Sequence, residues 1–143
     1  MTSTEQPPTD SSPETLLEPG PRGELAIRTL AMPADTNPSG DIFGGWVMAQ
    51  MDVAGGITAA ERARGRVATV AVDGFVFHKP VYVGDVLCCY GDVVRVGKTS
   101  IVIRIEAWAL RRRDPGQRVK VTEGTFTFVA LDDQGNKRLV PTD

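Results

Sequence analysis

The chain has 143 residues, the length of one domain, with 16 basic and 18 acidic side chains and a net charge of −2. This balance argues against a general nucleic-acid-binding protein, which usually has a strong basic excess. No run approaches the roughly 18 apolar residues of a membrane span. The N-terminus also lacks the pattern of a secretory signal, so we expect a cytoplasmic protein that binds neither nucleic acid nor a membrane.

The cysteine and histidine content argues against a disulfide framework and against a metal site. Cys88 and Cys89 are adjacent, and neighbours in a strand point to opposite faces, so a bond between them is sterically poor. We interpret both as small, reduced residues of a strand. His78 is the only histidine and no Cys-x-x-Cys pair occurs, so we expect no bound metal.

The first 22 residues differ in composition from the rest. They hold five of the ten prolines, four acids and one base, with few apolar side chains. Such a segment buries too little surface to offset the entropy lost on ordering. We therefore expect a disordered, acidic, proline-rich tail over residues 1–22, followed by one folded domain over residues 23–141.

The folded part opens with a strand and a long helix. The β-leaning stretch 24–32 stops at Pro33, and a long turn, 34–41, follows. Residues 43–62 then read as one helix of 20 residues, roughly 30 Å long. From Val47 to Ala60 only Asp52 is charged, and a helix that is apolar on nearly all sides is typically buried.

Every later segment reads as a strand, with short turns between successive strands that favour antiparallel pairing. The predicted strands cover residues 66–78, 85–96, 99–110 and 118–131. They are much longer than the usual strand of about 5–6 residues, which indicates a strongly curved antiparallel sheet. The fold class is therefore α+β, with the sheet wrapped around the helix.

One sheet cannot cover every side of such a helix, so we expect a partner to complete its burial. Gly55 and Gly56 support this interpretation, because two glycines inside a helix cost about 1 kcal/mol each relative to alanine. We expect this cost to be offset by the close approach of another backbone, such as a helix or strand of the partner.

The start of the helix has features of an anion site. Gly44 and Gly45 lie where backbone N–H groups have no partner within the helix, and without a Cβ a ligand can approach them closely. The helix dipole adds partial positive charge there, which suits the oxyanion of an attacked acyl carbonyl. The alternative, that the two glycines only loosen a turn, stays open.

Two acids flank this region, and each has a functional and a structural interpretation. Asp41, just before the helix, is either a helix cap or a base or nucleophile beside the oxyanion site. Asp52 lies about 11–12 Å from Gly44 along the helix axis, too far to share a site with Asp41 in one chain. If two helices pack antiparallel about a two-fold axis, Asp52 of one chain approaches Asp41 of the other. Otherwise Asp52 is a hydrogen-bonded acid at a subunit contact.

At these residues the sequence resembles the bacterial YciA-type acyl-CoA thioesterases of the hotdog-fold superfamily. The resemblance covers about residues 22–141, and its motifs are Arg28–Asp35, Thr36-Asn37, Gly40–Trp46, Gly65–Val67, Val83–Val86, Cys88–Tyr90, Thr122-Glu123 and Phe128–Ala130. It implies a long central helix wrapped by an antiparallel sheet of about five strands. It also implies homodimers, often joined as a trimer of dimers, and hydrolysis of acyl-CoA to free acid and CoA without a cofactor.

The resemblance also assigns roles to residues. In related families the key acid or amide lies just before the Gly-Gly helix start or inside the helix, which are the positions of Asp41 and Asp52. We rank Asp41 first and place the oxyanion contact on the backbone of Gly44 and Gly45. Asn37, in the turn before Asp41, is included among the substrate contacts.

Coenzyme A is polyanionic, so cations should line the site of its phosphates. Arg66 follows Gly65 in the helix-to-strand loop, and Lys98 lies in a hairpin turn with Ser100 close by. Similar loops hold the nucleotide in this superfamily. Solvated surface charge is the alternative for these cations, and it is our interpretation of the run 111–113.

Two other functions are alternatives. A non-catalytic acyl-CoA-binding hotdog module would normally carry a DNA-binding domain, and the tail of 22 residues is too short for one. A hotdog hydratase or dehydratase is the second alternative, and in some hotdog dehydratases a histidine that precedes the helix works with a helix acid. His78 follows the helix by many residues, so we interpret it as an ordinary strand histidine.

Overall fold

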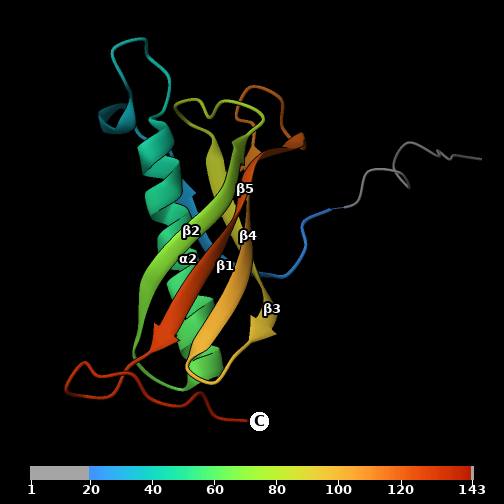
Figure 1. Cartoon of the computed structure of the whole chain (residues 1–143). Helices are drawn as coiled ribbons and strands as arrows, with labels where there is room; N and C mark the ends of the chain where they lie inside the picture. The colour runs from blue at the N-terminus through green and yellow to red at the C-terminus, as the bar shows by residue number, and fades with distance from the viewer. Residues whose placement is uncertain (1–19, 143) are drawn as a thin grey trace, which may run out of the picture.

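The computed structural model describes residues 20–142 as one long helix and a five-stranded antiparallel sheet (Figure 1). The predicted tail therefore falls almost entirely outside the described residues. The elements are β1 (Glu24–Leu30), the 3-10 turn η2 (Pro33–Asp35), α2 (Gly44–Ala63), β2 (Val67–Phe77), β3 (Val86–Val96), β4 (Ser100–Leu110) and β5 (Arg118–Ala130). Each predicted helix and strand is present, with ends shifted by at most two residues.

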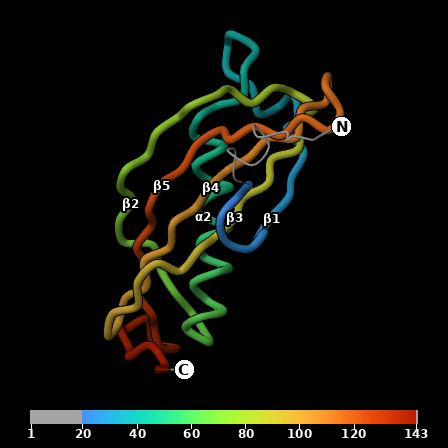
Figure 2. Tube along the Cα trace, turned by 90° about the vertical axis from the view of Figure 1, so that its right-hand side faces the viewer, coloured from blue at the N-terminus to red at the C-terminus, as the bar shows by residue number. Residues whose placement is uncertain are grey.

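The sheet has the strand order β1-β3-β4-β5-β2, and all neighbouring strands are antiparallel. Every strand pair contains a register shift, which bends and twists the sheet locally. Figures 1 and 2 show the result, a long sheet that curves around one side of α2. The hotdog-type arrangement implied by the sequence resemblance is therefore confirmed.

Helix α2 ends in a sharp reversal that leads directly into β2. Arg64 adopts the left-handed conformation, with φ of 55° and ψ of 45°. Its backbone N–H and that of Gly65 donate to carbonyl oxygens of the last helical turn. This tight exit places the loop 64–66 at the end of the molecule opposite the start of the helix (Figure 1).

The core lies between α2 and the concave face of the sheet. The helix contributes mainly small residues, which let it lie close to the strands. Its buried residues are Val47, Met51, Ala54, Gly55, Ala59 and Ala63. The sheet contributes larger side chains, among them Ile101, Ile103, Ile105, Phe126 and Phe128, each at most 2% exposed.

Gly55 is required by this packing, and the reason differs from the one expected. A Cβ at Gly55 would lie 2.5 Å from Ile105 Cδ1 and 2.8 Å from Phe128 Cζ. The chain's own side chains, rather than another backbone, therefore exclude a larger residue there. At Gly56 the nearest atom, Phe128 Cε2, would be 3.9 Å away, which is an ordinary contact.

One side of the helix and the β2 edge of the sheet remain uncovered. Met48, Val53 and Ile57 of α2 are between 38% and 53% exposed. Strand β2 pairs only with β5 among the described strands. Its exposed apolar residues are Val70, Val72, Val76 and Phe77. Apolar side chains along a free strand edge are typical of an interface with another chain.

The two adjacent cysteines behave as expected for reduced strand residues. Cys88 and Cys89 are both free and buried. Burial raises the pKa of both thiols, that of Cys89 to about 12, so neither forms the reactive thiolate near neutral pH.

Gly55 and Gly56, adjacent glycines within α2, provide a matched test of this packing. We expect Gly55→Ala to lower the free energy of unfolding by about 1–3 kcal/mol, because the added methyl overpacks the core. Gly56→Ala should leave it unchanged or raise it by up to about 1 kcal/mol, since alanine favours the helix. Urea unfolding measures both. Equal stability of Gly55→Ala and the wild type would contradict the packing described, and loss of the oligomer in Gly56→Ala would show a partner at that glycine.

Candidate functional site

The start of α2 presents backbone donors without competition from a side chain. Phe43 is the N-cap residue, and no side chain caps the helix. Because the first N–H groups of a helix have no acceptor within it, those of Gly44 and Gly45 remain available to a ligand. Phe77 lies beside this start, since a Cβ at Gly44 would be 3.3 Å from its ring.

Asn37 builds the turn that presents Asp41. Its Oδ1 accepts the backbone N–H of Ser39 at 2.9 Å and that of Asp41 at 3.1 Å. Its own backbone N–H donates to Asp41 O at 2.7 Å. The Asp41 side chain is exposed and does not cap the helix, so the capping interpretation of this acid is not supported.

A cavity of about 350 Å³ connects these residues. It lies between the start of α2 and the segment that follows β2, and Asn37, Asp41 and Gly44 all line it. The rest of the lining is mostly apolar: Ile42, Val47, Phe77, His78, Lys79, Pro80, Val81 and Val121. The cavity therefore combines a carboxylate, an amide and free backbone donors against an apolar wall, an arrangement suited to an acyl carbonyl.

Asp52 lies elsewhere in the chain. Thr69 Oγ1 on β2 donates to Asp52 Oδ1 at 2.6 Å, and the half-buried carboxylate does not line the cavity of Asp41. The single chain keeps the two acids apart, in agreement with the sequence-based spacing. Because β2 is an edge strand of the sheet, Asp52 is held beside the uncovered side of the helix.

The predicted coenzyme A contacts gather at the opposite end of α2. Gly65 and Arg66 follow the helix. Lys98 lies in the β3–β4 turn at that same end, and Ser100 begins β4 (Figures 1 and 2). The helix has 20 residues, so this end is roughly 30 Å from Gly44. The side chains of Arg66 and Lys98 are exposed and form no hydrogen bond or ion pair within residues 20–142.

Arg111 differs from the sequence-based interpretation, because it is a structural residue rather than a solvated one. Its side chain is 12% exposed and pairs with the buried Asp85 at 2.6 Å. It also donates to Pro80 O at 2.9 Å and lies over the ring of Tyr82, 4.9 Å from the centroid. Arg112 and Arg113 are exposed, as expected.

A cluster of charges on the outer face of the sheet was not predicted from the sequence. Glu106 is 2% exposed, accepts from Trp108 Nε1 at 3.0 Å and pairs with Arg104 at 3.2 Å. Glu123 pairs with Arg104 and Lys120. The alternation of charged residues along β4 and β5 was the available signal. Only the register, which sets Glu106 opposite Glu123, shows that they meet.

His78 lies between this cluster and the cavity of Asp41. Its Nε2 is 3.4 Å from Glu123 Oε2, and His78 and Lys79 line both the Asp41 cavity and an outer cleft of about 700 Å³. The side chain is 40% exposed. Its contact with Glu123 shows that the histidine is part of the outer charge cluster.

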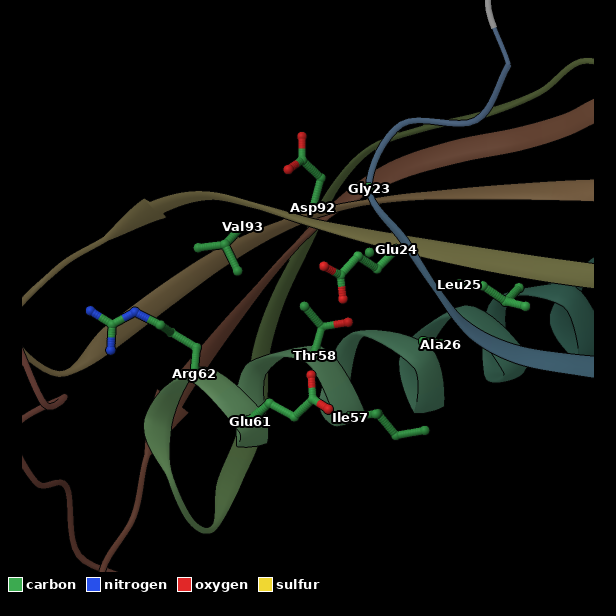
Figure 3. Close-up of a pocket in the computed structure, with 11 residues that line it drawn as sticks. Gly23, Glu24, Leu25, Ala26, Ile57, Thr58, Glu61, Arg62, Asp92 and Val93 are labelled. Carbon is green, nitrogen blue, oxygen red and sulfur yellow. The ribbon is translucent and has the colours of Figure 1, made fainter. Parts of the chain in front are cut away.

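A third cleft, of about 720 Å³, contains none of the predicted site residues. It lies between the start of β1, β3 and the second half of α2 (Figure 3). Figure 3 shows carboxylates of Glu24, Glu61 and Asp92 around it, with Arg62 at one side. This excess of negative charge is unfavourable for a polyanionic ligand, so the cavity of Asp41 is the better candidate.

Within residues 20–142, no three histidine, cysteine or acidic side chains gather where they could hold a metal ion. The only long helix there, α2, is not apolar enough over its length to cross a membrane.

The outer charge cluster generates a prediction about pH. The hydrogen bond from Lys120, with Arg104 and His78 nearby, lowers the pKa of Glu123 from 4.5 to about 2. A carboxyl group with a lowered pKa stabilises the fold above its unfolded pKa, and this contribution is lost as pH falls toward 2.

We therefore expect Glu123→Gln to lower the free energy of unfolding at pH 7 by about 1–2 kcal/mol, and the difference from the wild type to shrink between pH 4.5 and pH 3. Urea unfolding at several pH values measures this. Glu61→Gln, which alters an exposed carboxylate without an ion pair in residues 20–142, is the control. A difference independent of pH would contradict the role of the charge.

Comparison with known proteins gives consistent matches. The thioesterase superfamily matches residues 39–115. The acyl-CoA thioester hydrolase YciA of Salmonella typhimurium is 55% identical over 129 residues, which cover 89% of this chain and 97% of that protein.

Solved structures extend the likeness to three dimensions. HI0827, a hexameric broad-specificity acyl-coenzyme A thioesterase solved as an aspartate-to-alanine variant, has a TM-score of 0.83 and 52% identity, covering 85% of this chain and 89% of its own. The acyl-CoA hydrolase of Staphylococcus aureus, solved with butyryl coenzyme A and coenzyme A, has a TM-score of 0.74 and 31% identity, covering 80% and 70%.

Proposed function

This chain belongs to the thioesterase superfamily of hotdog-fold proteins, and from that premise we propose how it hydrolyses acyl-CoA thioesters to a free acid and CoA. The observation that carries the mechanism is the meeting of Asn37, Asp41 and the free N–H groups of the α2 start in one apolar-walled cavity. Relatives with 55% identity over most of the chain have this activity by name.

The reaction needs a base and an oxyanion site. A carboxylate takes a proton from water while the water oxygen attacks the carbonyl carbon, and the electron pair moves to the carbonyl oxygen. The N–H groups of Gly44 and Gly45 stabilise that oxyanion. Collapse of the tetrahedral intermediate breaks the C–S bond, and the CoA sulfur leaves with the proton. Direct attack by the carboxylate, through an anhydride, is the variant in which the same group is a nucleophile.

Asn37 supplies a further donor in this mechanism. Its Oδ1 already accepts two backbone N–H groups, so its NH₂ group is the part left to face the cavity. We propose that this amide contacts the thioester carbonyl or the attacking water.

The reacting carboxylate is either Asp41 or Asp52. Asp41 is favoured by its place in the cavity with Gly44. Asp52 is favoured by a comparison: the Staphylococcus aureus enzyme was solved with alanine at an asparagine and at an aspartate fifteen residues apart. Asn37 and Asp52 have this separation here, whereas Asp41 is only four residues from Asn37. Both acids belong to the proposed site, and Asp52 would enter it from a partner subunit.

A two-fold dimer brings the separated parts together. With two α2 helices antiparallel and the axis near Met48, the partner subunit's Asp52 faces Gly44, because both lie four residues from that point. The last turn of the partner's helix then lies roughly 17 Å from Gly44, against roughly 30 Å within one chain. The extended pantetheine arm of CoA has a length of this order, so the phosphates reach Arg66 and Lys98 at the end of the partner's helix.

The uncovered apolar surfaces support this dimer. They lie on α2 and on the free β2 edge, which continuous pairing of two sheets would cover together. The hexameric assembly named for HI0827 fits three such dimers. In the proposed mechanism CoA is part of the substrate and no resident cofactor takes part. The two buried thiols fit a reducing compartment such as the cytoplasm.

Variants at the two acids decide the role of each. We expect substitution of the reacting aspartate by asparagine to reduce kcat by about 10²–10⁴-fold, because the base is lost while the shape of the side chain is kept. The other Asp→Asn variant should retain kcat within about tenfold. The measurement is hydrolysis of acyl-CoAs of several chain lengths by Asp41→Asn and Asp52→Asn.

Near wild-type rates in both variants would rule out this mechanism. Enoyl-CoA turnover in preference to thioester cleavage would favour the hydratase alternative. The observation in favour of that alternative is that His78 lines the Asp41 cavity. Tight CoA binding without hydrolysis of any acyl-CoA would favour the non-catalytic alternative.

The proposed dimer is tested at the β2 edge. Val72 is 40% exposed there, and Val72→Glu would place a charge in the apolar interface, so we expect dissociation and loss of activity together. Val94→Glu, at a 48% exposed position of β3, is the matched control and should keep the wild-type mass. Light scattering measures the mass, and an unchanged assembly in Val72→Glu would contradict pairing through this edge.

A further inference from the structure

The segment that follows β5, residues 131–142, joins the two loops that carry the candidate coenzyme A cations. We call it the C-terminal strap. Near its start, the Leu131 N–H donates to Arg66 O at 2.9 Å. Near its end, the Val140 N–H donates to Lys98 O at 2.7 Å. Figures 1 and 2 show the strap, in red, passing beneath the end of α2 and the β3–β4 turn.

The strap is hydrogen-bonded internally, so it has a defined shape. Asp132 Oδ1 accepts the N–H groups of Gln134 at 2.9 Å and Asn136 at 2.8 Å. The Asp132 N–H donates to Asn136 O at 2.7 Å, which closes the turn. Because the turn is closed by these hydrogen bonds, its two ends are held at a fixed position relative to each other.

Arg138 fixes this turn to the end of α2. Its Nη2 donates to Ala63 O at 2.9 Å, and its Nε donates to Leu131 O at 2.8 Å. The guanidinium thereby satisfies a carbonyl of the last helical turn, at the helix end where positive charge is favourable. It also lies against Gly65, where a Cβ would be 2.7 Å from Nη2.

The bonds of Arg138 therefore act on the two cations through the backbone. Arg66 directly follows Gly65, against which Arg138 lies, and the Arg66 carbonyl accepts the Leu131 N–H, so its loop is fixed on both sides. Lys98 is fixed at the other end of the strap. The side chains of Arg66 and Lys98 stay exposed and unbonded within residues 20–142, available to a ligand.

We propose that Arg138 is a positioning residue for the phosphate end of coenzyme A: through the C-terminal strap it sets the separation of Arg66 and Lys98. This inference rests on the proposed function, because that function supplies the phosphates. Arg138 itself contacts backbone rather than substrate. Its effect should therefore depend on whether the thioester carries the nucleotide.

The test compares two substrates with the same acyl group. Butyryl-CoA carries the phosphates, and the butyryl thioester of N-acetylcysteamine lacks them. We expect Arg138→Met to raise KM for butyryl-CoA about tenfold with kcat within about twofold, and to leave the kinetics of the short thioester unchanged. Calorimetry should show the same loss, about tenfold, in the affinity for CoA itself.

Lys137→Met is the matched control. It removes one positive charge from the neighbouring position of the strap, and Lys137 is exposed with no side-chain bond within residues 20–142. It should behave as the wild type with both substrates. Arg66→Met should reproduce the pattern of Arg138→Met. If Arg138→Met does not fold, as circular dichroism will show, Arg138→Lys provides the same comparison.

Equal losses with both thioesters would overturn the inference, because they would show a general role in folding. An unchanged KM and CoA affinity in Arg138→Met would overturn it as well. Failure of the proposed function has a different signature, since the wild type would then hydrolyse neither thioester. The CoA affinity would still report on Arg138 in that case.

Discussion

The structure depends on the burial of a small-residue face of one helix against one sheet. Gly55 and the alanines of α2 let the helix lie against Ile105 and Phe128, and no larger residue fits at Gly55. This contact covers the concave face of the sheet. It leaves the opposite side of the helix and the β2 edge without a cover, so the same packing that makes the single chain compact also leaves it incomplete.

The geometry of the site follows from that incompleteness. A helix of 20 residues separates the oxyanion donors at one end from the cations at the other. A molecule with an acyl group and phosphates has to contact both. Two antiparallel copies shorten the distance, because the end of one helix then passes the start of the other. Because the helix is so long, the oxyanion donors of one chain and the cations of the other chain would serve the same substrate.

Much of the fold was predictable from the sequence because its signals are local. Pro33, the Gly44-Gly45 start and the glycine-containing turns mark element ends, and the apolar helix with one acid stands out from the alternating strands. The turn around Asn37 and the proximity of Asp41 to Gly44 are also local, since few residues separate them. For these reasons the architecture agrees with the sequence-based expectations, and Asp41 lies beside the start of the helix in one cavity with Gly44.

The features that were missed depend on contacts between distant segments. The pairing of Arg111 with Asp85, the cluster of Glu106 and Glu123, and the core reason for Gly55 all require knowledge of strand register or of the opposing surface. A charge run such as 111–113 looks solvated until its buried acid is known. The role of Asp52 depends on a second chain, which no spacing within one chain determines.

The strand order has a consequence for how the chain comes together during synthesis. Strand β2 is made directly after the helix, yet its only neighbour in the described sheet is β5, the last strand. Val67 pairs with Ala130, so this edge closes only after some sixty further residues have been made. Until then the nascent chain exposes a valine-rich strand beside an apolar helix, and such an unpaired edge is prone to aggregation.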